Sequence, residues 1–225
     1  MLCLLLLALT VACGRDEPPR PADPAPAAPE VVRSADVRPA VVFLGTSLNA
    51  GLGVPLEAAY PARIQERIDA SGLEFRVVNA GVSGDTSAGG LRRIEWVLRQ
   101  PIAVLVLELG ANDMLRGQDV PAMRANLQQI IDRTRARYPD VAIVIAGMQS
   151  APNLGDAYAQ AFADAFADLA RTNDAALIPF LLDGVASIAE LNQPDGIHPT
   201  AEGHRRVAEN VWSVLEPVLQ ARAGG

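Results

Sequence analysis

The sequence predicts an α/β domain in which five parallel strands form a sheet between two layers of helices. Two observations carry this prediction: five short apolar runs recur from residue 40 onward, and segments with the spacing of amphipathic helices lie between them. Apolar runs without polar alternation are typical of strands buried on both faces of a parallel sheet. Their alternation with helices over about 180 residues favours a three-layer α/β/α architecture.

The predicted elements follow one another in a regular order. The expected strands are Ala40–Leu44, Phe75–Ala80, Ile102–Leu109, Val141–Gly147 and Ala176–Leu182. Apolar residues at helical spacing mark the clearest helices, which run from Met123 to Tyr138, from Tyr158 to Leu169 and from Val207 to Val218. We expect the folded domain to span residues 40–222.

Residues 1–12 predict a signal peptide. They are almost wholly apolar and uncharged. A run of this length suits the apolar region of a signal peptide and is shorter than the roughly 20 residues that cross a bilayer. The stretch from Thr10 to Cys13 resembles the lipobox of bacterial lipoproteins, which implies lipidation of Cys13, export, and anchoring to a membrane facing the periplasm or cell surface. The alternatives are a buried strand or a misplaced start codon.

Residues 13–39 predict an extended linker. Seven prolines fall between Arg15 and Pro39, with scattered charges and no apolar period. Proline-rich chain favours the extended polyproline II conformation, at about 3.1 Å per residue. We therefore interpret this stretch as a tether between Cys13 and the folded domain. A proline-rich ligand for a partner domain is the alternative.

Composition excludes several classes of function. Acidic residues outnumber basic ones by 26 to 19, giving a net charge of −7, the opposite of the balance typical of nucleic-acid binding. No lysine is present, which excludes Schiff-base and P-loop chemistry. Two cysteines and two histidines are too few for a cysteine-rich zinc site or a disulfide scaffold. We expect no metal and no cofactor.

Residues suited to acyl transfer stand at the ends of four predicted elements. Ser47 follows the first strand, Gly84 the second and Asn112 the third, and Asp195 and His198 come after the fifth. Loops at the carboxyl ends of parallel strands meet at one edge of the sheet. That edge would gather a hydroxyl nucleophile, a histidine base with its carboxylate, and donors for an oxyanion.

Each motif alone also has an ordinary structural interpretation. Ser47 is a favoured helix N-cap, Gly84 begins a turn signal, and Asp195 with Gly196 is another. Their joint occurrence at one predicted edge favours the catalytic interpretation.

These blocks resemble those of the SGNH (GDSL) hydrolases, in particular the secreted bacterial branch similar to lysophospholipases and arylesterases. The resemblance covers residues from about Ala40 to the last helix and implies a flavodoxin-like SGNH hydrolase fold. It implies Ser47 as nucleophile, His198 as base and Asp195 as its partner. It also implies an oxyanion hole formed by the backbone N–H groups of Ser47 and Gly84 and the side-chain amide of Asn112.

The sequence departs from this family at Thr46, where the family usually has aspartate, and at Ala111, where a second glycine is common. The other histidine, His204, is expected at the surface of the last helix. Glu108 lies within the apolar third strand and would need hydrogen bonds if buried; the sequence assigns it no role beyond a supporting bond near the site.

The resemblance implies a serine esterase acting on short-to-medium acyl or aryl esters, with thioesters and lysophospholipids as further candidates. We expect four apolar side chains to line the acyl pocket, namely Leu115, Met148, Pro152 and Leu154. Three alternatives stay open: an acetyl esterase or acyltransferase on a cell-surface polysaccharide, a non-catalytic lipoprotein that binds lipid or glycan, and a metal-dependent hydrolase. The sequence sets no oligomeric state.

Overall fold

The computed structural model describes residues 36–224, apart from the side chain of Pro152. The predicted signal peptide, Cys13 and most of the predicted linker lie outside the described residues. Within the described part, no helix combines the length and apolar character needed to cross a membrane.

Five parallel strands form one sheet in the order β2-β1-β3-β4-β5. This order confirms the predicted α/β class and the parallel sheet. The strands are β1 (Ala40–Gly45), β2 (Arg76–Gly81), β3 (Ile102–Glu108), β4 (Ala142–Ala146) and β5 (Ala176–Ile178). The centre of the sheet consists of buried valine, leucine and isoleucine, whereas the edge strand β2 is only partly buried.

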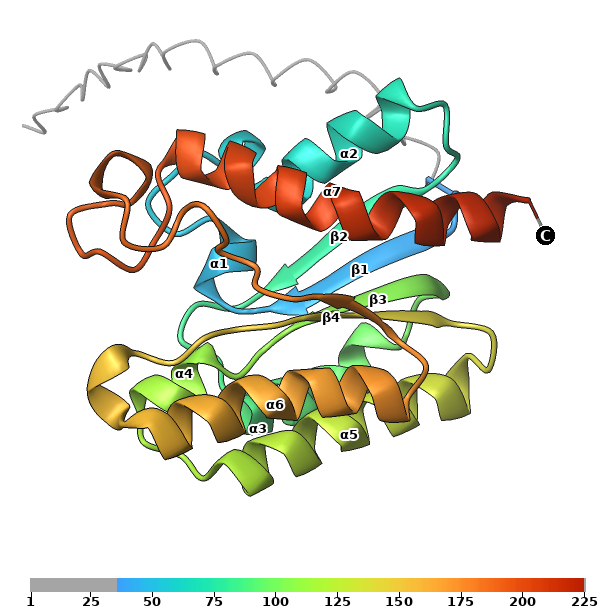
Figure 1. Ribbon diagram of the computed structural model, residues 1–225. Helices are drawn as coiled ribbons and strands as arrows, with labels where there is room; N and C mark the ends of the chain where they lie inside the picture. Colours follow the sequence, from blue (N-terminus) through green and yellow to red (C-terminus); the bar gives the residue numbers. More distant parts are fainter. Residues whose placement is uncertain (1–35, 225) are drawn as a thin grey trace, which may run out of the picture. The chain divides into compact units, whose positions relative to one another are not determined.

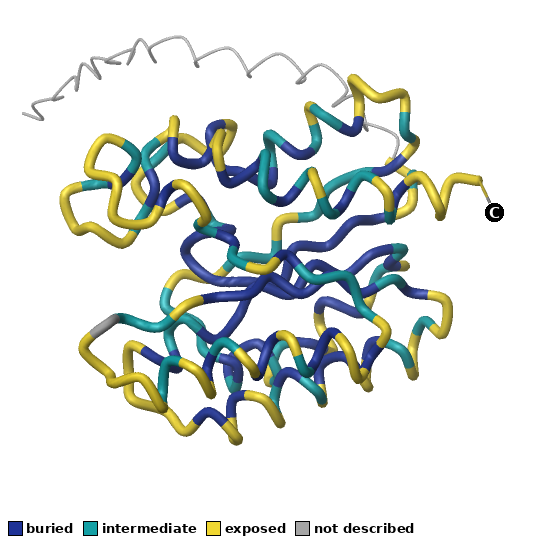
Figure 2. Tube along the Cα trace, in the orientation of Figure 1, coloured by how far each residue is buried: buried dark blue, intermediate teal, exposed yellow. Residues whose placement is uncertain are grey.

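Helices cover both faces of the sheet, as expected for three layers. Helices α2 and α7 lie on one face and α3, α5 and α6 on the other (Figure 1). Their buried sides face the sheet and their exposed sides face outward (Figure 2). The α-helices are α1 (Ser47–Ala50), α2 (Tyr60–Ala70), α3 (Ser87–Val97), α4 (Ala111–Leu115), α5 (Val120–Arg137), α6 (Asp156–Thr172) and α7 (Ala201–Ala223). The short 3-10 helices are η1 (Leu56–Ala58), η2 (Pro152–Leu154) and η3 (Ala189–Leu191).

The fifth strand is shorter than predicted and ends at Ile178. Pro179 has no backbone N–H and cannot continue the strand's ladder. The chain instead crosses close to Gly147, whose carbonyl accepts a hydrogen bond from the Leu181 N–H at 2.9 Å. A Cβ on Gly147 would collide with the carbonyl of Pro179. This crossing directs residues 180–198 over the carboxyl edge of the sheet instead of along it.

Candidate active site

The first part of the site is the turn between β1 and α1. Thr46 caps α1, and its hydroxyl accepts a hydrogen bond from the Leu48 N–H at 3.4 Å. The turn is tight, because a Cβ on Gly45 would collide with the side chains of Asn49 and Glu108. Ser47 follows at the first position of α1, at the carboxyl end of β1, which lies between β2 and β3 in the sheet. The local sequence thus places one hydroxyl at this edge.

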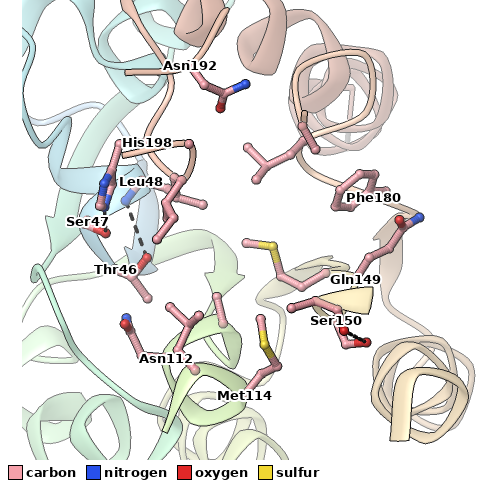
Figure 3. A pocket seen from close by; sticks show the side chains of 18 of the residues that line it. Thr46, Ser47, Leu48, Asn112, Met114, Gln149, Ser150, Phe180, Asn192 and His198 are labelled. Atoms are coloured by element: carbon pink, nitrogen blue, oxygen red, sulfur yellow. Dashed lines mark hydrogen bonds between the residues drawn. The ribbon is translucent and has the colours of Figure 1, made fainter. Parts of the chain in front are cut away.

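Ser47, His198 and Asp195 form a hydrogen-bonded chain. His198 Nε2 lies 2.9 Å from Ser47 Oγ, and His198 Nδ1 lies 2.6 Å from Asp195 Oδ2. Figure 3 shows the imidazole of His198 directed at the hydroxyl of Ser47. Asp195 and His198 come from the loop before α7, so the structure brings together residues that are far apart in the sequence. The structure thus brings together the three residues to which the sequence resemblance gives catalytic roles.

The loop around Asp195 fixes the ionisation of this chain. Asp195 Oδ1 accepts the backbone N–H groups of His198 at 3.0 Å and Ile197 at 2.9 Å. The His198 backbone N–H, together with the His198 ring and the Ile197 N–H, holds the pKa of the Asp195 carboxyl well below its usual range. An ionised carboxylate only accepts hydrogen bonds, so the proton lies on His198 Nδ1. Nε2 is then left to accept a proton from Ser47.

Asn112 contributes a donor from the end of β3. Its side-chain amide donates to the carbonyl of Asp85 at 2.9 Å, which leaves a second N–H on the same nitrogen. Asn112 lines the same cavity as Ser47 and His198 (Figure 3). A backbone N–H at Ser47 and a carboxamide N–H at Asn112 are groups that can stabilise a developing oxyanion.

Gly84 lies beside this cavity and is not among its lining residues. Its φ of +78° is a conformation that glycine adopts without strain. The turn is fixed by two arginines: Arg116 donates to the Gly84 carbonyl at 2.7 Å, and Arg93 pairs with Asp85 at 2.7 Å. Arg93 also donates to the carbonyls of Gly45 and Ala80, so it ties the ends of β1 and β2 to this turn.

A cavity of about 500 Å³ opens next to Ser47, within the range of about 300–1,000 Å³ that is typical of small-molecule sites. Its apolar lining comes mainly from three segments: α4, the loop after β4, and the segment 180–198. The larger apolar side chains lining it are Leu48, Met114, Leu115, Met148, Phe180, Leu182 and Ile197. Apolar groups of a substrate would be removed from water here.

Two of the four predicted pocket residues, Leu115 and Met148, line this cavity. Leu154 does not: it is 39% exposed and belongs to η2, which leads away into α6. The prediction for Leu154 is therefore wrong. The side chain of Pro152 lies outside the described part of the chain. Phe180 and Leu182 were missed because the sequence assigned them to the fifth strand.

His204 corrects another expectation, because it is buried rather than at the surface. Its Nδ1 accepts the backbone N–H of Tyr60 at 3.3 Å, and its ring stacks on that of Tyr60. Burial, together with the nearby charge of His198, lowers the pKa of His204 to about 4. His204 shares the helical spacing of Val207 and Val211, a signal that identifies the buried face of α7.

Glu108 is fully buried at the end of β3. Its carboxylate accepts the backbone N–H of Thr46 at 2.7 Å and the Thr46 hydroxyl at 3.0 and 3.1 Å. The supporting bond near the site that the sequence suggested is therefore present, and Thr46 is its donor. Burial raises the pKa of Glu108 to about 7, against the opposing effect of these hydrogen bonds.

Comparison with known proteins decides the family. The sequence profile of the GDSL-like lipase/acylhydrolase family matches residues 43–206. The chain belongs to this family. A 38% identical relative is the esterase TesA of Pseudomonas aeruginosa, aligned over 180 residues that cover 80% of this chain and 89% of the relative. The arylesterase of Vibrio mimicus is 35% identical over 176 residues, covering 78% of this chain and 87% of that protein.

A solved structure named TesA superposes with a TM-score of 0.75 at 38% identity, covering 79% of this chain and 98% of that chain. The fold is therefore that of the SGNH hydrolases, as the sequence resemblance implied. Within this GDSL family the protein is a serine ester hydrolase.

Proposed function

We propose that this GDSL-family hydrolase cleaves carboxylic esters through an acyl-enzyme on Ser47, with His198 as general base and acid and Asp195 as its orienting partner. The observation that carries the proposal is the continuous chain of hydrogen bonds from Ser47 Oγ through His198 to Asp195, at the wall of an apolar cavity. No cofactor enters this chemistry.

In the first half of the reaction, Ser47 Oγ attacks the ester carbonyl carbon while its proton passes to His198 Nε2. Asp195 stabilises the imidazolium that forms. The backbone N–H of Ser47 and the amide of Asn112 would donate to the developing oxyanion, with Gly84 as the third donor that the resemblance implies. His198 then gives its proton to the leaving alkoxide oxygen, and an alcohol departs.

In the second half, His198 takes a proton from water as the water oxygen attacks the acyl carbon. The resulting tetrahedral intermediate collapses, and the bond from the acyl carbon to Ser47 Oγ breaks. Ser47 Oγ regains a proton from His198, and a carboxylic acid is released. Each proton taken by Nε2 is returned, so the enzyme ends in its starting state.

The apolar lining of the cavity favours acyl chains of medium length. Each buried methylene contributes about 0.8 kcal/mol, which is roughly fourfold in an equilibrium or rate ratio. We therefore expect kcat/KM on p-nitrophenyl esters to rise at least tenfold from two to eight carbons. The measurement compares esters of two, four, eight and twelve carbons with the full chain. A preference for acetate would instead support the alternative of an acetyl esterase acting on a polysaccharide.

We also propose that the hydrolase domain, residues 40–222, is exported and held at a membrane through a lipidated Cys13 and the linker 13–39. The apolar residues 1–12 and the lipobox-like stretch ending at Cys13 support this proposal. In a bacterial host, Cys13→Ser is expected to move the protein from the membrane fraction to the soluble fraction and to abolish labelling by a radioactive fatty acid. Unchanged fractionation and labelling of Cys13→Ser would contradict the anchor.

A further inference from the structure

One buried acid at the site has no part in the proposed reaction. Glu108 does not line the cavity and does not contact Ser47 or His198 through any recorded hydrogen bond, yet its carboxylate is fully removed from water. Burying a carboxylate is costly unless donors surround it. Two such donors are the backbone N–H and the hydroxyl of Thr46. Both belong to the turn that carries Ser47.

That turn has little stability of its own. Helix α1 has only four residues, far fewer than an isolated helix needs. The Thr46 hydroxyl has a single proton, which it donates to Glu108, and this leaves its oxygen lone pairs for the N–H of Leu48. Because Glu108 pairs in register with Gly45 on the neighbouring strand, the sheet fixes the turn through this carboxylate.

We propose that Glu108 is a positioning residue whose ionised carboxylate, acting through Thr46, holds the strand-to-helix turn in the geometry that presents Ser47 for ester hydrolysis. The proposal rests on Ser47 being the nucleophile of the proposed function. It also gives Thr46 a role: a hydroxyl donates to Glu108, whereas the aspartate usual in the family would donate only when protonated.

The charge on Glu108 makes this positioning dependent on pH. Two other titratable groups face it among the described residues. The positive charge of Arg93, from α3, favours ionisation of Glu108. Tyr60, from α2, has a pKa raised by burial and by the charge of Glu108, so it stays neutral. Since burial raises the pKa of Glu108 to about 7, acidification through neutral pH protonates Glu108. His198 must lose its own proton to act as a base.

Activity should therefore depend on the loss of two protons. In the wild type, log kcat/KM is expected to rise with a slope approaching two at the acid end of the profile. Glu108→Gln removes one of these ionisations while keeping the shape of the side chain, so its slope should fall to one. A purely structural role for Glu108 would lower activity without changing this slope.

Thermal stability provides a second readout, in which Glu108→Gln has the opposite effect to its effect on activity. The pKa of Glu108 is raised in the folded state from a reference value of 4.5 to about 7. Its contribution to stability is therefore fully present below about pH 4.5 and is lost as pH rises through 7. Glu108→Gln has no such ionisation. We expect its melting temperature, relative to the wild type, to increase between pH 5 and pH 8, although its activity is lower.

The experiment compares full-length variants on p-nitrophenyl butyrate between pH 5 and pH 9. At pH 8, Glu108→Gln and Thr46→Val should each lower kcat/KM by about 10–100-fold, as expected for a misplaced nucleophile. Thr46→Ser restores the donor and should recover most of the activity that Thr46→Val loses. The double variant Glu108→Gln/Thr46→Val should have a kcat/KM no lower than that of the less active single variant, because both substitutions break the same contact. The surface variant Glu95→Gln is the matched control for loss of a carboxylate.

Two results would overturn the proposal. One is a folded Glu108→Gln protein with kcat/KM within threefold of the wild type and an unchanged acid slope. The other, which decides the matter if Glu108→Gln does not fold, is equal activity of Thr46→Val and Thr46→Ser. Ser47→Ala, assayed beside them, separates this outcome from failure of the proposed function. If Ser47→Ala is inactive and Glu108→Gln is fully active, only the role of Glu108 is refuted.

Discussion

Replacement of Ser47 by alanine is expected to lower ester hydrolysis by roughly 10⁴–10⁶-fold, as loss of the nucleophile does in other serine hydrolases. Ser47 Oγ is the atom that His198 Nε2 contacts at 2.9 Å, and alanine offers nothing to deprotonate. The other recorded contacts of this chain, between His198 and Asp195, are unaffected. The variant therefore loses the covalent step and keeps the cavity.

The measurement combines turnover of p-nitrophenyl butyrate with thermal unfolding. Unfolding of Ser47→Ala should stay within about 1 kcal/mol of the wild type, because one hydroxyl is removed and no apolar packing is lost. Ser213→Ala is the matched control, since Ser213 is an exposed serine on α7 that bonds only within its own helix. A fluorophosphonate ester should add mass to the wild type and to Ser213→Ala but not to Ser47→Ala.

Substantial activity in a folded Ser47→Ala protein would assign the chemistry to another nucleophile. A folded wild type without turnover on any ester, and without phosphonylation of Ser47, would instead favour the non-catalytic binding role left open by the sequence. The two outcomes are distinct, because the first keeps an enzyme and the second does not.

The sequence could predict that Ser47, Asp195 and His198 would lie together, because they stand in loops that follow strands. The apolar runs that form β1 and β3 are unmistakable, and the parallel topology brings their carboxyl ends to one edge. Ser47 and Asn112 follow those strands directly. The pairing of His198 with Asp195 was predictable from their short spacing. A loop of that length lets one carboxylate accept hydrogen bonds from both the imidazole N–H and the local backbone N–H groups.

The wall of the cavity was harder to predict, because it depends on how a loop crosses the sheet edge. Phe180 and Leu182 continue an apolar run in the sequence, and only the crossing at Gly147 shows that the strand has already ended. Leu154 appeared equally apolar but belongs to a short helix that leads away from the cavity. Apolar composition alone does not distinguish these cases.

The partners of buried polar groups were also hard to predict from the sequence. Glu108 looked anomalous in an apolar strand, but its partner Thr46 is 62 residues distant and is set by strand register. His204 is similar: its position on the buried face of α7 is readable from helical spacing, whereas its acceptor role toward the Tyr60 N–H depends on how α2 packs against that helix. Pairings across elements require the three-dimensional arrangement.

Replacement of Asn112 by alanine is expected to lower kcat by about 10²–10³-fold, the usual effect of removing one oxyanion donor. The amide of Asn112 has two N–H groups, one of which the Asp85 carbonyl accepts. The second would meet the negative charge that appears on the substrate carbonyl oxygen only in the transition state. The loss should therefore fall on kcat more than on KM.

An alkylboronic acid distinguishes this role from a structural one. Boronates form a tetrahedral, anionic adduct on a serine oxygen, which resembles the transition state. If Asn112 stabilises the oxyanion, Asn112→Ala should weaken boronate inhibition by a factor close to its loss in kcat, because both depend on the same charge. Asn126→Ala, which removes a carboxamide that donates to Ser87 Oγ away from the cavity, is the matched control. A kcat within threefold of the wild type, or a large loss in kcat with unchanged boronate affinity, would refute the role of Asn112 as a donor to the oxyanion.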